Sequence, residues 1–483
     1  MGNSAAKQLA SNTIWNAFEK FSQLGIQLLC TFILARFLTP SDFGIVGMLV
    51  IFTQISKTIT DSGFSIAIIR EKEVTKEDLS SVFYLNLILA VIIYWILFFC
   101  SPYIAAFYHE PILNDVCKVT FLVIPIFALT LIQTTLLKRN LQFKKLSIIT
   151  FVSSIVASIV AVFLAYYYKN VWALVIQNLL TFVIEALLLW ITTKWHPSLI
   201  FSIKSISKYF RFSKNLLLTG LLGSVFNNIN ALLIGHFYTS TDLGFYSQAN
   251  RINGIASHTS TDVIKSVSFP VLSKYYNNGG DLKSGYKKVI LVTILFVGSI
   301  ITLLMSISDD LFEILMGGPE WRLAGKYLFL LGLSGILYPL HAVNQNVLNV
   351  KGDSRTILFL EIIRRCILIL ILAIALQFSV PVFVASYSFY SFVLLFVNLH
   401  YCGKPINYST KEQLIDIAPI IARLFLVLLF SFVCNSLFVS FSIYVRCFLT
   451  MVLSTLLLLL LFYRTKVFNE VLILLAGILK KEK

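Results

Sequence analysis

Long apolar stretches separated by short polar loops run along almost the whole chain. A stretch of about 20 mainly apolar residues, at 1.5 Å per residue, is the length that spans a lipid bilayer. The pattern therefore predicts an all-α integral membrane protein with about 14 transmembrane helices. We place them at residues 12–38, 42–66, 81–101, 114–137, 146–168, 171–193, 212–237, 242–268, 289–308, 327–350, 356–378, 381–401, 417–439 and 442–463.

The composition excludes a water-soluble protein of this length. Apolar residues make up 58% of the 483 residues and charged residues 13%, against about 45–50% and 25% in soluble proteins. The net charge of +16 is explained by orientation in a membrane rather than by nucleic-acid binding. With both termini in the cytoplasm, the cytoplasmic tails and loops hold 25 of the 39 Lys and Arg residues, and the outer loops and helix ends hold four. This asymmetry is what the positive-inside rule predicts. The polar N-terminus has no cleavable signal, so we expect the first apolar stretch to remain as a span.

One short turn occurs twice in the sequence. Residues Phe37–Gly44 recur as Phe237–Gly244, with Phe, Thr, Asp and Gly in register. We expect each copy to form a tight turn on the outer side, with its Asp capping the next helix. Chance similarity between two polar turns is the alternative. Because the copies are six spans apart, they favour a parallel repeat of two six-helix lobes with a site between them near the midplane.

The repeat predicts three parts of the chain. Residues 1–200 form the N-lobe with helices 1–6, and residues 201–403 form the C-lobe with helices 7–12. Residues 404–483 contain helices 13 and 14, as an appended pair, and the C-terminal tail.

Polar side chains lie on one face of a few predicted helices. Lys57 and Asp61, for example, are four residues apart and therefore share a helical face. A charge facing lipid at the bilayer centre costs at least ~2.5–3.5 kcal/mol, so these residues either line a water-filled cavity or form internal ion pairs, such as Lys57 with Asp61 or Lys265 with Asp262. Arg251 follows Asp242 by nine residues, which places it about 14 Å into the bilayer.

The charge balance of the predicted spans indicates the substrate. Ten Lys and Arg residues lie within spans, apart from Arg36 near an outer end, against five acids beyond the first two residues of a span. This excess favours an anionic, hydroxyl-rich substrate that Asn and Gln side chains can also bind. The predicted substrate-binding residues are Arg251, Lys57, Lys20, Asn16, Gln23 and Asn227. The predicted ion-coupling residues are Asp61 and Asp262. We expect no catalytic residue, metal or cofactor, because the sequence contains no phosphate-binding loop, HExxH motif or cluster of metal ligands.

Several short motifs resemble a known family in their order and spacing. They are Leu34–Leu38, Asp42–Gly44, Asp61–Ser65, Phe269–Leu272, Tyr338–Ala342 and Asn349–Gly352. Together they resemble the oligosaccharide-flippase branch of the multidrug/oligosaccharidyl-lipid/polysaccharide exporter superfamily, in particular its Wzx-like group of the WzxC type. The family has no fixed signature of binding residues, so the resemblance adds no site residue.

The resemblance implies two six-helix lobes and a helix pair around a cavity that opens alternately to each side of the bacterial inner membrane. The implied substrate is a polyprenyl-diphosphate-linked oligosaccharide, carried to the outer leaflet for lipopolysaccharide O-antigen, capsule or exopolysaccharide. The expected energy source is an ion gradient of H⁺ or Na⁺. Expected partners are membrane lipid, a polysaccharide polymerase and the export machinery, but no nucleic acid.

Three other functions remain open at this point. A drug/cation antiporter of the same superfamily would have an acidic cavity, against which the basic excess argues. A polysaccharide polymerase or ligase would need a large outer loop with converging Arg and His residues, and the sequence has none. A scaffold subunit of a synthesis complex would leave the aligned charges without a role.

Overall fold

The chain folds into helices throughout its described part. The computed structural model describes residues 22–261, 264, 268, 272–273, 276–277, 279–465 and 467–468, and every regular element in these ranges is a helix. Eleven of the described helices are long and apolar enough to cross a membrane. The all-α membrane fold is therefore confirmed, and the count of 14 spans stays a prediction. One predicted span outside the eleven, at 356–378, forms α15 (Ser354–Ala375), which carries several charges.

The helices form two compact units, residues 1–244 and 245–483. Helix α10 (Ser240–Gly254) crosses from one unit to the other. The predicted division into residues 1–200, 201–403 and 404–483 stays a prediction. The two units are described one after the other.

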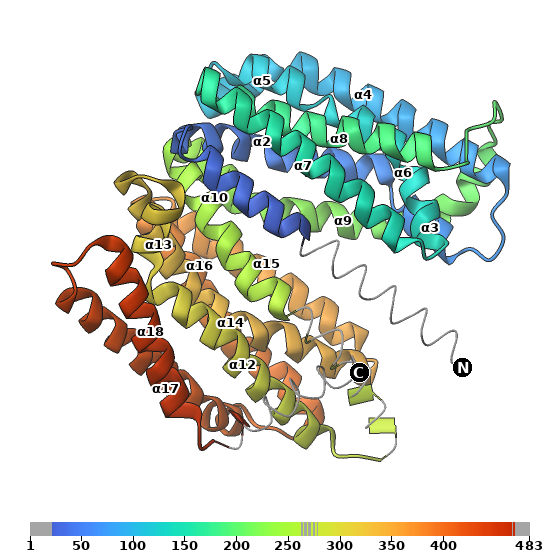
Figure 1. The fold of residues 1–483 in the computed structure, drawn as a ribbon. Coiled ribbons are helices and arrows are strands. Elements are labelled where there is room, and N and C mark those ends of the chain that lie inside the picture. Colours follow the sequence, from blue (N-terminus) through green and yellow to red (C-terminus); the bar gives the residue numbers. More distant parts are fainter. Residues whose placement is uncertain are drawn as a thin grey trace. The chain divides into compact units, whose positions relative to one another are not determined.

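The N-terminal unit is a bundle of long helices joined by short turns. Its elements are a helix at Ser22–Leu34, α2 (Pro40–Asp61), α3 (Phe64–Arg70), α4 (Lys76–Tyr108), α5 (Leu113–Thr120), α6 (Val123–Arg139), α7 (Phe143–Tyr168), α8 (Trp172–Thr192) and α9 (Ile203–Phe237). Helices α7 and α8 lie side by side in Figure 1, and α2 packs against α9. Helix α9 begins nine residues before the predicted start at residue 212, since Ser202 caps it by accepting a hydrogen bond from the Ser205 amide.

The predicted continuous helix at 42–66 is wrong, because the chain breaks between α2 and α3. Ser62 and Gly63 both adopt left-handed backbone conformations, with φ of 48° and 75°. A β-carbon on Gly63 would lie 3.0 Å from Cβ of Leu216 and 3.2 Å from Cβ of Ser213, on α9. Glycine is favoured here both by the positive φ and by the close approach of α9.

Both copies of the repeated turn start a helix. In the first copy the backbone N–H of Thr39 donates to Oδ2 of Asp42, at 2.8 Å. In the second copy the backbone N–H of Thr239 donates to Oδ2 of Asp242, at 3.3 Å. Each threonine hydroxyl also donates to the same carboxylate. The predicted helix start is present, but the residue at the cap differs from the prediction: Thr39 is the N-cap of α2, and each Asp is the third residue of its helix and accepts from the Thr that precedes the helix.

The C-terminal unit is also a helical bundle. It contains the end of α10, a π-helical turn η1 (Ile255–Thr259), α12 (Leu282–Ser306), α13 (Ser308–Met316), a 3₁₀ turn η2 (Pro319–Trp321), α14 (Arg322–Lys351), α15 (Ser354–Ala375), α16 (Val380–Gly403), a 3₁₀ turn η3 (Lys404–Ile406), α17 (Thr410–Leu437) and α18 (Ile443–Phe462). Its main core joins α12 and α14 to α17 and α18, through buried residues such as Ile290, Leu340, Leu424 and Phe462.

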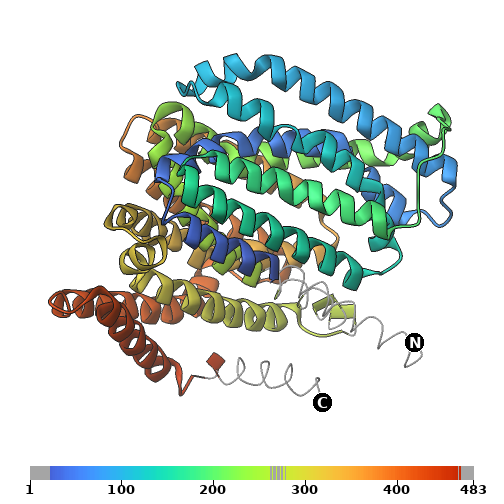
Figure 2. The ribbon, with the colours of Figure 1, turned by 45° about the horizontal axis from the view of Figure 1, so that its top comes forward.

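The last two helices are bound to this unit by polar contacts as well as by the core. Helices α17 and α18 lie side by side in Figures 1 and 2. Lys287 of α12 forms an ion pair with Asp416 of α17, at 2.7 Å. Arg446 of α18 donates through Nε to Oδ2 of Asp310 in α13, also at 2.7 Å. The helix pair is thus fixed to the unit near both of its ends.

Candidate functional site

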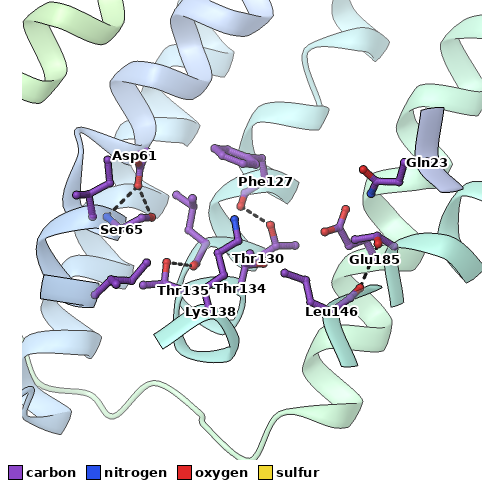
Figure 3. A pocket seen from close by; sticks show the side chains of 14 residues that line it. Gln23, Asp61, Ser65, Phe127, Thr130, Thr134, Thr135, Lys138, Leu146 and Glu185 are labelled. Carbon is purple, nitrogen blue, oxygen red and sulfur yellow. Dashed lines mark hydrogen bonds between the residues drawn. The ribbon is translucent and has the colours of Figure 1, made fainter. Parts of the chain in front are cut away.

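A polar cavity of about 400 Å³ lies within the N-terminal unit, between helices that are otherwise apolar. Figure 3 shows its lining, which comes from the helix Ser22–Leu34 and from α2, α3, α6, α7 and α8. The lining residues are Gln23, Asp61, Ser65, Ile66, Ile69, Phe127, Thr130, Leu131, Thr134, Thr135, Lys138, Leu146, Thr150 and Glu185. Polar groups at the end of a membrane helix bundle are costly to bury unless they meet water or a ligand.

The break after α2 positions the first carboxylate of the cavity. Asp61 is the last residue of α2, and its Oδ1 accepts a hydrogen bond from the backbone N–H of Ser65, at 3.2 Å. The Ser65 hydroxyl donates to the same oxygen. Because the chain turns at Ser62 and Gly63, Asp61 and Ser65 face the cavity together, as Figure 3 shows. These contacts hold the Asp61 carboxylate in place.

The threonine hydroxyls of the lining present mainly acceptor oxygens. Thr130 donates to the Phe127 carbonyl at 2.8 Å, and Thr135 donates to the Leu131 carbonyl at 2.6 Å. Thr150 likewise donates to the Leu146 carbonyl, at 3.1 Å. A hydroxyl has a single proton to donate, so each of these oxygens is left with lone pairs. Together with the two carboxylates, they make a lining rich in acceptors, which suits a ligand rich in hydroxyl donors.

Lys138 supplies a positive charge between the two carboxylates. In Figure 3 its amine points into the cavity, with Asp61 on one side and Glu185 on the other. No salt bridge within 4 Å joins Lys138 to either acid in the described part of the chain. The amine therefore faces the cavity, where a ligand could reach it.

Lys57 of α2 lies beside this cavity, next to one aromatic ring of α6 and one of α8. Its ammonium group is 3.9 Å from the ring centroid of Phe182 and 5.4 Å from that of Phe127, which places it in the range of a cation–π interaction. Glu185 also attracts it electrostatically. The ion pair with Asp61 that the sequence left open does not form within 4 Å between these two described residues.

The structure brings only some of the predicted site residues together. Gln23 and Asp61 line the cavity, and Lys57 lies next to it. Asn227 is exposed on α9, and Arg251 is half-buried on α10, in the C-terminal unit. Lys20, Asn16 and Asp262 lie outside the described residues. The binding and coupling roles of all these residues stay predictions.

Sequence reasoning gave no role to Glu185 and Lys138. Glu185 is the one acid in the apolar helix α8, and an isolated acid in a span is by itself a signal of a functional site. Lys138 was placed in a cytoplasmic loop, one residue beyond the predicted end of its helix. In the structure α6 continues to Arg139, so Lys138 belongs to the cavity.

Comparison with curated proteins places the chain among proteins of bacterial polysaccharide assembly. It is 26% identical, over 73% of both chains, to the teichuronic acid biosynthesis protein TuaB of Bacillus subtilis. It is 25% identical to the succinoglycan biosynthesis transport protein ExoT of Rhizobium meliloti, over 69% of this chain and 68% of that protein. The lipopolysaccharide biosynthesis protein WzxC of Escherichia coli is 21% identical over 69% of this chain and 68% of its own.

Solved structures share the fold at low sequence identity. The lipid II flippase MurJ, in an inward closed conformation, matches with a TM-score of 0.70 and 13% identity, over 94% of this chain and 99% of that one. An inward-facing multidrug resistance transporter of the MATE family matches with a TM-score of 0.64 and 14% identity, over 81% and 96%. The sequence profile of the family described as polysaccharide biosynthesis protein matches residues 33–324. The chain belongs to this polysaccharide biosynthesis protein family.

Proposed function

We propose that this protein is a flippase. It carries a polyprenyl-diphosphate-linked oligosaccharide from the cytoplasmic to the outer leaflet by alternating access, for the assembly of a surface polysaccharide. The observation that carries the proposal is the acceptor-rich cavity among membrane-spanning helices. Sugar hydroxyls donate to carboxylates and to threonine oxygens, so this lining suits the polar part of such a substrate.

The similarity to known proteins supports the proposal that this protein is a flippase. The family is named for polysaccharide biosynthesis, one relative is named as a succinoglycan transport protein, and a lipid II flippase shares the fold. In our proposal, Arg251, Lys57 and Lys20 attract the diphosphate, while Asn16, Gln23 and Asn227 bind the sugars. Asp61 and Asp262 carry the H⁺ or Na⁺ that drives the cycle, and the protein makes or breaks no covalent bond in the substrate.

We place the protein in the bacterial inner membrane with both termini in the cytoplasm. The distribution of Lys and Arg supports this orientation. With this orientation, Lys138 and Asp61 lie towards the cytoplasmic ends of their helices, where the substrate enters. Polymerase and export machinery on the outer side would then use the transported product.

A cellular experiment tests the proposal through the cavity carboxylates. The gene is deleted and replaced by wild type, by Asp61→Asn with Glu185→Gln, or by Asp115→Asn. Asp115 is a control carboxylate whose side chain is 71% exposed. We expect the deletion and the double variant to lose surface polysaccharide and to accumulate lipid-linked oligosaccharide in the inner leaflet, while the control resembles wild type. Normal surface polysaccharide in the deletion strain would contradict the proposal.

One observation favours a second candidate function, a drug/cation antiporter. Two carboxylates, Asp61 and Glu185, line the cavity with a single amine, Lys138, and an acidic cavity attracts cations. Overexpression in a drug-sensitive strain distinguishes the two functions. An antiporter would raise resistance to cationic dyes through both carboxylates, whereas the flippase leaves resistance unchanged.

A further inference from the structure

Helix α9 is longer than a membrane span requires. It has 35 residues and is therefore about 52 Å long, whereas the hydrocarbon core of a bilayer is about 30 Å thick. The sequence predicted a span that starts at residue 212, but the helix begins at Ile203. In the orientation proposed above, its first turns extend from the bilayer to the cytoplasmic surface. The basic residues that precede residue 212 in α9 therefore belong to a helix instead of a loop.

Three of these basic residues lie on one face of α9. Lys204, Lys208 and Arg211 follow one another at steps of four and three residues, which places them on the same side of a helix, and all three are exposed. The buried side of the helix is held against α4, because the Tyr209 hydroxyl donates to Oδ2 of Asp78 at 3.2 Å. We refer to Lys204, Lys208 and Arg211 as the α9 basic stripe. The positive-inside rule depends on the number of cytoplasmic charges and does not explain their alignment on one face.

The α9 basic stripe has more positive charge than its neighbours neutralise. Lys208 forms an ion pair with Glu71, which follows α3, at 3.2 Å. Among the described residues, neither Lys204 nor Arg211 forms a salt bridge within 4 Å. Three cations against one carboxylate leave an excess of two positive charges. An exposed ion pair contributes little to stability, so internal pairing does not account for the stripe.

The same face of α9 changes its chemistry further along the helix. Asn215 and Thr219 follow Arg211 at steps of four residues, and both are exposed. The Thr219 hydroxyl donates to the backbone carbonyl of Asn215 at 2.8 Å, so its oxygen keeps lone pairs for an outside donor. Leu222 comes next on this face and is 58% exposed. The face is therefore basic at its cytoplasmic end, then hydrogen-bonding, and then apolar.

From these observations we propose that the α9 basic stripe binds the diphosphate of the lipid-linked oligosaccharide in the inner leaflet. A diphosphate diester carries a negative charge on each phosphate, which matches the excess charge of the stripe, and phosphate oxygens accept strong hydrogen bonds from Lys and Arg. The headgroup of an ordinary anionic phospholipid carries its charge on a single phosphate. Asn215 and Thr219 then face the sugars, whose hydroxyls pair with amide and hydroxyl groups. The inference rests on the proposed function and extends it, because it adds a binding surface on α9 to the diphosphate contacts proposed above.

Lipid binding to the purified full-length protein tests this surface. The probes are undecaprenyl-diphosphate-linked N-acetylglucosamine and, separately, phosphatidylglycerol. Each is titrated in detergent solution, and native mass spectrometry gives the dissociation constant. The variant Lys204→Gln with Arg211→Gln removes the two charges that have no carboxylate partner and keeps the ion pair of Lys208 with Glu71.

Two control variants separate the stripe from net charge. Lys404→Gln with Lys411→Gln removes the same charge from exposed side chains of the C-terminal unit, also on the cytoplasmic side in the proposed orientation. Lys204→Arg with Arg211→Lys keeps the charges of the stripe and exchanges the two donors. Both controls should bind the diphosphate probe as wild type does.

We expect the affinity for the diphosphate probe to fall about tenfold in Lys204→Gln with Arg211→Gln, while the affinity for phosphatidylglycerol changes much less. An equal loss for both lipids would show a general contact with anionic lipid and would overturn the proposal, as would the same loss in the control at Lys404 and Lys411. No loss in the stripe variant, or no binding of the diphosphate probe to wild type, overturns it as well. If the double variant does not fold, Lys204→Gln and Arg211→Gln alone decide the matter, each with a several-fold loss expected.

The experiment separates this inference from the proposed function. A protein that binds the diphosphate probe through Lys204 and Arg211 but fails to transport a lipid-linked oligosaccharide contradicts the proposed function alone. A protein that transports it, with binding that is indifferent to Lys204 and Arg211, contradicts only the role of the α9 basic stripe.

Discussion

Gly44 and Gly244 each pack against the turn that precedes the other. A β-carbon on Gly44 would lie 1.7 Å from the carbonyl oxygen of Ser240, and one on Gly244 would lie 1.8 Å from that of Pro40. The hydroxyl oxygens of Ser41 and Ser240 are 2.8 Å apart. The two copies of the repeated turn therefore contact each other in a reciprocal arrangement. This contact explains why both copies contain glycine at the same position.

Replacing either glycine by alanine should destabilise the protein. Because the new methyl group would overlap a backbone carbonyl, the turns must separate, at a cost of about 1–3 kcal/mol. We expect Gly44→Ala and Gly244→Ala each to lower the thermal unfolding temperature in detergent. Gly223→Ala is the control, since a β-carbon there meets nothing within 4 Å. Equal unfolding temperatures for all three variants would contradict the contact.

The interaction of Lys57 with Phe182 should be measurable as a coupling energy. A buried ammonium group 3.9 Å from a ring centroid gains about 0.5–2 kcal/mol from the ring. In a double-mutant cycle with Lys57→Met and Phe182→Leu, we predict a coupling of about 1 kcal/mol in the free energy of unfolding. Additive effects of the two substitutions would show that the ring does not stabilise the charge.

The pair of Arg446 and Asp310 should be essential for attaching α18. Their side chains are only 14% and 8% exposed, and removing one partner of a buried ion pair costs about 3–5 kcal/mol. Arg446→Met should therefore strongly lower the unfolding temperature. The double variant Asp310→Leu with Arg446→Met removes both charges and should recover most of the loss. If the double variant is less stable than Arg446→Met alone, the pair is not what attaches the helix.

Asp309, in α13 outside the membrane-spanning helices, should make stability depend on pH. Burial raises the pKa of its carboxyl group above the ordinary value, although Lys326 opposes this effect. The folded protein then binds the proton more tightly than the unfolded chain, so this stabilisation is complete at low pH and is lost as pH rises through the raised pKa. Asp309→Asn should raise the unfolding temperature at pH 7, by an amount that shrinks as pH is lowered towards 4. A difference that does not change with pH would contradict the raised pKa.

The sequence predicted the features that local pattern determines. Long apolar runs identified most spans, and the Thr and Asp spacing identified the starts of α2 and α10. The break at Ser62 and Gly63 was missed, because it depends on the approach of α9, which lies far away in sequence. Apolar periodicity continues through such a break without a change. Only the positive φ angles and the packing reveal it.

The cavity was only partly predictable for a related reason. Asp61 and Gln23 were identified because they lie on polar helix faces. Glu185 is the one charged residue of its own helix, so its place in the cavity depends on side chains that come from other helices, among them Lys138 of α6. Side chains that meet from different helices leave no periodic signal in any one of them.

Transport in proteoliposomes tests the central claim most directly. The purified protein is reconstituted with a polyprenyl-diphosphate-linked oligosaccharide in the inner leaflet and an imposed ion gradient, and a glycan-modifying enzyme is added outside. We predict that wild-type protein makes the oligosaccharide accessible to the enzyme well above the level of protein-free liposomes, and that Asp61→Asn with Glu185→Gln abolishes this accessibility. Accessibility with correctly folded wild-type protein no greater than in protein-free liposomes would contradict the claim that the chain is a flippase.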